Sequence, residues 1–473
     1  MALILARFQS PQQVFFKTFF HASLAWFFLG SIVPVRLDGG DWPHFLGPHY
    51  DGTSDEKGIR TDWSNGQLPL LWSRPLGTSY GIGAVAQGKY FQLDRFGSDE
   101  RLTCLDATTG ELRWESNLPV DYEDLYGYNN GPRSTPAVAG DVVVTLGVAG
   151  ELVCRQVADG RIRWRVNTNQ KYGVVQNFFG VGTSPIILDD LVIVMVGGSP
   201  ERDQRLPMGA LDRVSSNGSA IVAFDLLTGT ERYRSGDYLA SYSTPRPMNL
   251  EGRQILIALV REGLLAIDPA AGKELFMFPW RSSILESVNA ACPLVKDRQI
   301  LISECYGVGS VLLEIDPRSL AVSAVRQDPA SRRQQSIRAH WATPIRVGEA
   351  VFASSGRNPN DSDLRCVDWR SGEVRWVENR RERVSLLGID GHLIVLGEYG
   401  RLDLIAANSE RYQWVTGLDL SVSDSRASDP RASNSLETPR PTLDSPCWAA
   451  PIVAHGRLYV RGNNHLLCFS LIP

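Results

Sequence analysis

A short strand–turn–strand unit, repeated along the chain, limits the possible fold more than any other sequence feature. In its clearest copy, an apolar strand ends at Asp106, a turn reaches Gly110, and a second strand carries Trp114. Asp106 can accept hydrogen bonds from turn amides, and Gly110 can adopt a positive φ. Because so small a unit cannot bury a tryptophan alone, each copy needs neighbouring copies to cover its ring.

Copies of this unit recur with the period of a β-propeller. Most successive aromatic positions lie roughly 40–50 residues apart, which indicates blades of several short strands rather than a helical solenoid. Two copies are degenerate, since residues 312–324 lack the aromatic residue and residues 402–414 lack the aspartate and the glycine. The structural positions expected in the further copies are Trp72, Trp164, Asp225, Gly229, Asp268, Gly272, Asp368, Gly372, Trp376 and Trp414.

The two ends of the repeat region complement each other. The last unit, residues 450–471, has no turn and no aromatic strand, whereas residues 70–76 supply an isolated aromatic strand. Pairing of this N-terminal strand into the last blade would close the ring and leave no open edge. The sequence therefore predicts an all-β fold, an eight-bladed β-propeller of four-stranded antiparallel blades. Seven blades remain the alternative because two units are degenerate.

Residues 1–35 have the pattern of an export signal. An uncharged, apolar stretch at residues 18–35 follows Arg7 and Lys17, as in a secretory signal peptide. No cleavage site is clear at its end, so a signal-anchor that stays in the membrane is the alternative. We expect an exported protein that is periplasmic or anchored to the membrane by residues 18–35, with no other membrane contact.

Three further regions follow the export signal. Residues 36–69 are rich in turn-forming residues and are expected to be an irregular lead-in. Residues 70–473 form the expected propeller. Residues 421–446, mainly Ser, Asp, Arg and Pro, form an expected disordered insert within it.

The cysteines follow the repeat rather than a disulfide framework. A small apolar slot in the strand before the turn explains cysteine there without redox chemistry, since alanine fills the same slot in other copies. The cysteines in this slot are Cys104, Cys154, Cys366 and Cys468.

These repeats resemble the PQQ-like β-propeller family, whose motif is matched by Cys104-Leu105-Asp106 through Thr109-Gly110 to Trp114. The resemblance covers roughly residues 70–473 and specifies fold more than function. The family includes quinoprotein dehydrogenases and also non-catalytic scaffolds of the outer-membrane assembly factor type, represented by BamB. The Trp42-Pro43 lead-in, with Phe45 and Gly47-Pro48, resembles exported PQQ-like proteins.

No catalytic or metal-binding motif stands out. Quinoprotein members of the family hold PQQ, with calcium, between a tryptophan and a vicinal disulfide, but the sequence has no Cys-Cys dipeptide. The seven histidines are scattered without metal-ligand spacing. We therefore expect no catalytic residue, no metal and no cofactor, with PQQ and calcium reserved for a dehydrogenase alternative. A net charge of −4 without a basic stripe argues against nucleic-acid binding.

The segments before each small residue–proline pair are the candidate binding residues. Such a pair opens the innermost strand of each unit, as in Thr135-Pro136 and Thr244-Pro245. The preceding segments therefore converge at the channel mouth, where their mixed side chains suit a ligand funnel or a protein-binding rim. The candidates are Tyr126, Tyr128, Asn129, Asn130, Arg133, Tyr172, Gln176, Asn177, Phe178, Phe179, Tyr242, Glu286, Asn289, Arg338, His340, Trp341 and Trp448.

These patterns favour a monomeric, non-catalytic scaffold that binds a protein, peptide or other envelope component at the channel mouth. The alternative is a PQQ-dependent dehydrogenase, or another enzyme with its site at the same mouth. Glu286 and His340 could form an acid/base pair if the fold brought them together.

Overall fold

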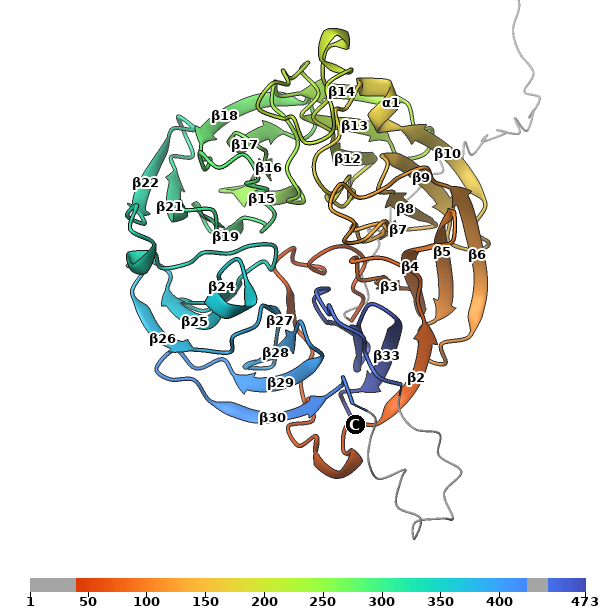
Figure 1. The fold of residues 1–473 in the computed structure, drawn as a ribbon, viewed down its shortest axis with the longest axis vertical. Helices are drawn as coiled ribbons and strands as arrows, with labels where there is room; N and C mark the ends of the chain where they lie inside the picture. The colour runs from red at the N-terminus through yellow and green to blue at the C-terminus, as the bar shows by residue number, and fades with distance from the viewer. Residues whose placement is uncertain (1–39, 423–440) are drawn as a thin grey trace, which may run out of the picture. The chain divides into compact units, whose positions relative to one another are not determined.

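The computed structural model describes residues 40–422 and 441–473, which form a β-propeller (Figure 1). Within these residues, eight sheets surround a central axis, each with four antiparallel strands that form a blade. The eight-bladed fold is thereby confirmed and the seven-bladed alternative is excluded. The expected export signal and residues 423–440 of the expected insert lie outside the described residues.

Each blade runs from an innermost to an outermost strand. Blade 1 contains β3 (Ala84–Ala86), β4 (Lys89–Phe96), β5 (Asp99–Asp106) and β6 (Leu112–Pro119), and blade 2 contains β7 (Ala137–Ala139), β8 (Val142–Leu146), β9 (Glu151–Gln156) and β10 (Ile162–Asn167). Blade 3 contains β11 (Ile186–Leu188), β12 (Leu191–Met195), β13 (Ile221–Asp225) and β14 (Glu231–Ser235), and blade 4 contains β15 (Arg246–Leu250), β16 (Arg253–Leu259), β17 (Gly263–Asp268) and β18 (Lys273–Pro279).

Blades 5 to 8 continue the same order. Blade 5 contains β19 (Leu294–Lys296), β20 (Gln299–Glu304), β21 (Gly309–Ile315) and β22 (Val322–Gln327), and blade 6 contains β23 (Ile345–Val347), β24 (Ala350–Ser355), β25 (Asp363–Asp368) and β26 (Val374–Glu378). Blade 7 contains β27 (Val384–Ile389), β28 (His392–Gly397), β29 (Arg401–Ala406) and β30 (Trp414–Asp419), and blade 8 contains β31 (Ile452–Ala454), β32 (Arg457–Arg461), β33 (His465–Ser470) and β2 (Leu70–Pro75).

The N-terminal strand closes the ring. β2 pairs antiparallel with β33, and Trp72 lies opposite Cys468. The same register places Trp114 opposite Cys104 in blade 1. The last blade is thus completed by the first strand of the repeat region, which confirms the expected closure and leaves no unpaired edge between the two chain ends.

The aromatic ring of one blade packs on the turn glycine of the next. A Cβ added to Gly160 would come within 2.5 Å of the Trp114 ring, and one added to Gly229 within 2.6 Å of Trp164. The indole nitrogen of Trp114 also donates a hydrogen bond to the Val157 carbonyl at 3.0 Å. Packing and hydrogen bonding therefore fasten neighbouring blades at the same place.

The turn that receives this ring is organised by its aspartate. Asp106 Oδ1 accepts the amides of Thr108 at 2.9 Å and Thr109 at 3.0 Å. A hydrogen bond from Arg113, together with these amides, lowers the pKa of Asp106 to about 2. Gly110 follows with a φ of 71°, so the turn needs both an acceptor and a residue without a Cβ.

The degenerate units keep the geometry with different residues. In blade 5, Leu320 takes the glycine place with a φ of 60°, and Arg326 replaces the aromatic ring, lying against Gly372 of blade 6. Trp414 differs from its expected role, because it is half exposed and donates to Asp403 of its own blade at 3.1 Å. The next blade has no corresponding turn, since its outermost strand comes from the N-terminal side.

Small residues before the prolines form a hydrogen-bonded belt along the channel from blade 2 to blade 6. Ser184 Oγ accepts the amide of Thr135 and Thr244 Oγ1 accepts that of Ser184, both at 2.9 Å. Cys292 Sγ accepts the Thr244 amide at 3.3 Å, and Thr343 Oγ1 accepts the Cys292 amide at 3.0 Å. Each innermost strand from blade 2 to blade 5 is therefore tied to the next.

The lead-in is ordered over residues 40–69 and closes one end of the channel. Trp42 pairs with Val85 of blade 1, and the Pro43 carbonyl accepts the Val138 amide of blade 2 at 2.8 Å. Its strand β1 (Thr53–Ser54) then pairs in parallel with β27 of blade 7. This segment thus crosses the channel and contacts blades on both sides of it.

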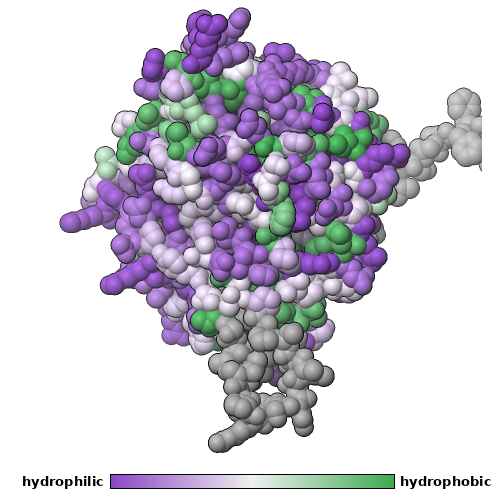
Figure 2. All heavy atoms as spheres, turned by 45° about the vertical axis from the view of Figure 1, so that its right-hand side comes forward, coloured by the Kyte–Doolittle hydropathy of each residue, from purple (hydrophilic) through white to green (hydrophobic). Residues whose placement is uncertain are grey.

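The remaining described structure is simple. It includes one short α-helix, α1 (Thr168–Tyr172), and the 3₁₀ helices Ser64–Gly66, Glu201–Asp203, Arg332–Gln334 and Pro359–Asp361. No helix within residues 40–422 and 441–473 is long and apolar enough to cross a membrane. All seven cysteines lie in these residues, buried and free. In the space-filling view, hydrophobic residues form separate patches on a mainly hydrophilic surface (Figure 2).

The glycine–ring contact predicts the stability of two matched variants. Gly160→Ala should force Trp114 out of its seat, whereas Gly88→Ala changes a glycine of similar φ whose added Cβ meets nothing within 4 Å. Gly88→Ala should cost about 1 kcal/mol of unfolding free energy from backbone strain. Gly160→Ala should cost ~1–3 kcal/mol more from overpacking. Urea unfolding followed by tryptophan fluorescence measures both, and equal losses would contradict the proposed contact.

The belt predicts a second pair of variants. Thr244→Val leaves the buried Ser184 amide without an acceptor, which should lower the unfolding free energy by ~1–3 kcal/mol. Thr135→Val makes the same chemical change, but Thr135 Oγ1 has no partner among the described residues. Because this hydroxyl makes no hydrogen bond, its replacement by a methyl group should change the unfolding free energy by less than about 0.5 kcal/mol. If calorimetry found equal losses for the two variants, the belt would not be the cause.

Candidate functional site

A deep funnel opens at the end of the channel opposite the lead-in. Its cavity of about 820 Å³ is lined by the connections between consecutive blades, and Phe45 and Leu46 of the lead-in form its floor. In an antiparallel blade, the connection after the outermost strand and the one after the second strand lie at the same end. We call this end the mouth face. A pocket of this size is typical of ligand or peptide sites.

Aromatic rings cover the funnel wall at blades 1 to 4. The ring centroids of Tyr126 and Tyr128 lie 5.8 and 6.1 Å from that of Phe179. Phe179 in turn lies 5.7 Å from Tyr242, whose hydroxyl accepts the Phe179 amide at 2.8 Å. Tyr126 and Tyr128 are 49% and 65% exposed, so this wall exposes large aromatic surface to the solvent.

Arg133 joins this wall to the neighbouring one. Its guanidinium lies 5.5 Å from the Tyr80 ring and 5.7 Å from the Phe179 ring. It also donates to the fully buried carboxylate of Asp124 at 2.6 Å. Because the ion pair fixes the guanidinium, Arg133 acts as a rigid spacer between aromatic rings.

A second arginine stands between two indoles on the opposite wall. Arg383 lies 4.5 Å from the Trp341 ring and 4.9 Å from the Trp448 ring. Glu398 accepts from Arg383 at 2.6 Å and from the Trp448 indole nitrogen at 3.1 Å. Trp448 also lies 4.7 Å from Tyr80. These contacts make the aromatic lining nearly continuous around the funnel.

His340 is a neutral wall residue. Burial, followed by the charges of Arg383 and Arg357, lowers its pKa to about 3. Its Nε2 lies 3.2 Å from the Tyr306 hydroxyl. Among the hydrogen bonds of the described residues, none joins His340 to Glu286, although both line the funnel. The acid/base pair considered from the sequence therefore has no direct contact that supports it, and it stays a hypothesis.

The structure brings many of the sequence candidates together and separates the others. Asn129 and Asn130 shape the turn before Arg133, and the Asn289 side chain is buried on backbone carbonyls. Tyr172 packs between blades 2 and 3 and donates to Glu231, and Arg338 contacts the Asp361 carbonyl. The candidates that line the funnel are Tyr126, Tyr128, Arg133, Phe178, Phe179, Tyr242, Glu286, His340, Trp341 and Trp448.

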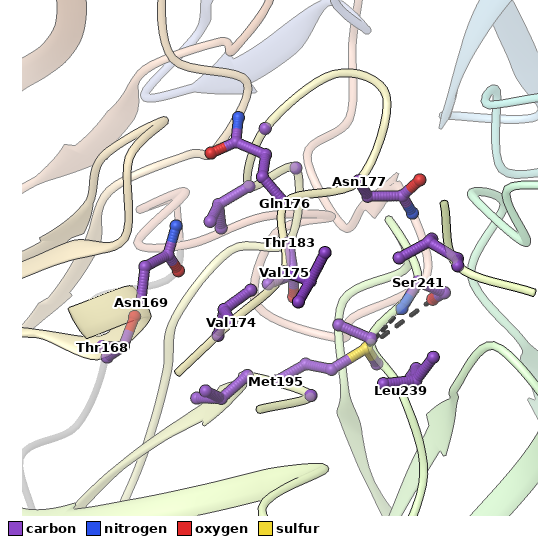
Figure 3. A pocket seen from close by; sticks show the side chains of 17 residues that line it. Thr168, Asn169, Val174, Val175, Gln176, Asn177, Thr183, Met195, Leu239 and Ser241 are labelled. Atoms are coloured by element: carbon purple, nitrogen blue, oxygen red, sulfur yellow. Dashed lines mark hydrogen bonds between the residues drawn. The ribbon is translucent and has the colours of Figure 1, made fainter. Parts of the chain in front are cut away.

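Gln176 and Asn177 line a separate, smaller cavity (Figure 3). Its volume of about 40 Å³ lies beside Met195, whose sulfur accepts hydrogen bonds from the amide and hydroxyl of Ser241. That space suits a buried water rather than a ligand. The funnel is therefore the candidate site.

Several lining residues are not among the candidates predicted from the sequence. Tyr306 and Arg357 belong to connections between the second and third strands, which also reach the mouth face. Strand alternation alone could have identified them. Tyr80 precedes a glycine-rich entry to blade 1 that lacks the proline marker. Phe45 reaches the funnel only because the lead-in crosses the channel, which no local pattern reveals.

The residues present do not fit a PQQ–calcium centre. Calcium prefers six to eight oxygen ligands, whereas the funnel lining offers the Glu286 carboxylate, and the nearby Glu398 is bound by Arg383 and Trp448. Within the described residues, no three His, Cys, Asp or Glu side chains are placed to hold a metal.

Comparisons with known proteins complement this geometry. The profile of a family described as outer membrane protein assembly factor BamB matches residues 60–199 and 98–312, together just over half of the chain. Curated protein sequences contain no match.

Solved structures share the fold at low sequence identity. BamB from Moraxella catarrhalis is 15% identical with a TM-score of 0.54, covering 85% of this chain and 98% of that chain. A europium-containing methanol dehydrogenase is 10% identical with a TM-score of 0.66, covering 92% and 98%. A quinohemoprotein alcohol dehydrogenase from Comamonas testosteroni is 13% identical with a TM-score of 0.58, covering 93% and 84%. At these identities, the similarity concerns the fold alone.

Proposed function

The chain belongs to the family described as outer membrane protein assembly factor BamB, and from this premise we propose that it is a non-catalytic scaffold. Its partner is a protein or peptide of the cell envelope, bound at the mouth face by a monomer that needs no cofactor. The family membership confirms the resemblance to PQQ-like repeats. It also supports protein assembly as the process in which such a scaffold acts.

The observation that carries the proposal is the aromatic lining of an open funnel. Exposed Tyr126 and Tyr128 stand at its rim, and half-buried Phe179 and Trp341 lie further inside. Tyrosine, tryptophan and arginine are the residues most enriched at energetically dominant interface positions. The two arginines fixed between rings stabilise this surface without leaving an unpaired buried charge.

Site-specific photo-crosslinking tests the face. With p-benzoylphenylalanine in place of Tyr128, cells producing the full chain should yield a discrete crosslinked envelope protein or peptide. Leu227 is the matched control, since it is 64% exposed on a turn at the opposite end of blade 3. Alanine at Tyr126, Phe179 and Trp341 should weaken the crosslink at least tenfold, because these rings supply buried contact area.

Two results would oppose this assignment. Equal crosslinking from positions 128 and 227 would remove the mouth face as the binding surface. Quinone absorbance and dye reduction with alcohols, after reconstitution with PQQ and calcium, would favour the dehydrogenase alternative, for which the shared fold of the dehydrogenases is the supporting observation.

We further propose that residues 1–35 direct export. Fusion of alkaline phosphatase after residue 473 should give active phosphatase, because this reporter matures only in an oxidising compartment. Removal of residues 1–35 should abolish that activity while the fusion still accumulates. Mass spectrometry of the purified protein then distinguishes cleavage from anchoring by residues 18–35. Activity without residues 1–35 would contradict the proposal.

A further inference from the structure

The mouth face is divided into two arcs of different chemistry. The aromatic arc lies over blades 1 and 2 and comprises Phe96, Leu125, Tyr126 and Tyr128. The arginine arc lies over blades 5 to 7, on the opposite side of the ring (Figure 1). It comprises Arg333, Arg338, Arg357 and Arg381.

Exposed apolar side chains make the aromatic arc unusual. Phe96 and Tyr128 are each 65% exposed, Tyr126 is 49% exposed and Leu125 is 46% exposed. They come from two neighbouring connections at the same end of blades 1 and 2. Contiguous apolar surface beside a cavity marks an interaction site more strongly than single exposed residues do.

The arginine arc carries uncompensated positive charge. Three of its acidic residues are engaged by other arginines, since Asp361 pairs with Arg332, Glu382 with Arg380 and Glu398 with Arg383. Among the described residues, the four arginines that define the arc have no ion pair. Arg357 instead lies 4.6 Å from the Tyr306 ring at the funnel wall. The arc therefore has guanidinium groups available for an acidic partner.

We propose that the mouth face binds an extended, acidic polypeptide segment that bears an aromatic side chain, an inference that rests on the scaffold function. The aromatic residue enters the funnel beside Tyr128 and Phe179, and the acidic residues continue across to the arginine arc. A cavity of about 820 Å³ admits a chain segment but not a folded domain. Guanidinium groups recognise carboxylates through paired hydrogen bonds.

A polypeptide suits these features better than an anionic lipid surface. The free guanidinium groups are interspersed with the ion pairs of Asp361, Glu382 and Glu398, so they do not form the continuous basic cluster that binds an anionic membrane. The deep aromatic funnel would also stay unfilled against a flat layer of headgroups. An acidic chain can place its carboxylates between these groups and its ring in the funnel.

Peptide binding to the purified full chain tests the inference. The probe is a fluorescein-labelled peptide of alternating glutamate and glycine with one central tryptophan, measured by fluorescence anisotropy. It should bind at least tenfold more tightly than the same peptide with lysine for glutamate, or with glycine for tryptophan. Raising the salt from about 0.05 to about 0.5 M should weaken binding, because salt screens exposed charges.

Charge reversal locates the site. Arg333→Glu with Arg357→Glu should weaken peptide binding at least tenfold. Arg318→Glu with Arg370→Glu is the matched control, because these exposed arginines also lack ion pairs but lie on the opposite-end turns of blades 5 and 6. The control pair should change binding less than twofold. Circular dichroism should show that both variants remain folded.

Each other outcome overturns the inference. Equal binding of the acidic and lysine peptides, or equal effects of the two variant pairs, would exclude the arginine arc as the surface that binds the peptide. Sedimentation with phosphatidylglycerol vesicles that is lost in the Arg333/Arg357 variant, without peptide binding, reassigns the arc to a membrane. A crosslink at position 128 with any of these results preserves the scaffold function. Peptide binding without that crosslink would contradict the scaffold function in cells but not the recognition of an acidic peptide by the mouth face.

Discussion

The contact between the aromatic side chain on the outermost strand of one blade and the turn of the next blade is the interaction on which the closed propeller depends. A single blade cannot bury Trp114 or Trp164, so each must dock on Gly160 or Gly229 of the following blade. This dependence makes a partial ring costly, because its last aromatic residue would stay exposed. The N-terminal strand resolves the problem at the seam, since Trp72 then docks on Gly110 of blade 1.

Contacts between neighbouring blades also form the funnel. On the inside, the belt from Thr135 to Thr343 ties neighbouring innermost strands together. The lead-in closes the other end, so that Phe45 becomes the floor of a cavity rather than part of an open channel. The repeated residues thus supply a rigid frame, and the connections that do not repeat are free to carry recognition.

The sequence predicted those features that repetition exposes. Blade number, ring closure and the small slot at Cys104 follow from comparing copies, because equivalent positions must meet equivalent surroundings. The exceptions depend on three-dimensional neighbours. Trp414 has no turn to dock on, because the chain ends fall in the last blade. The residues before proline could be recognised as small, but their role as amide acceptors needs the distance between blades. Tyr306 and Arg357 lie in connections between the second and third strands, which no small residue–proline pair marks in the sequence.

The funnel contains two kinds of arginine, and the difference explains how the proposed scaffold selects its partners. Arg133 pairs with Asp124 and Arg383 pairs with Glu398, and both guanidinium groups lie against aromatic rings, so their positive charge is neutralised within the wall. Arg357 is exposed and bound to no carboxylate of the described residues, so its charge faces the solvent at the rim. A wall stiffened by paired charges keeps aromatic surface open, while an unpaired charge at its edge favours acidic over basic partners. In the proposed scaffold, recognition therefore follows from which charges the fold neutralises and which it leaves exposed.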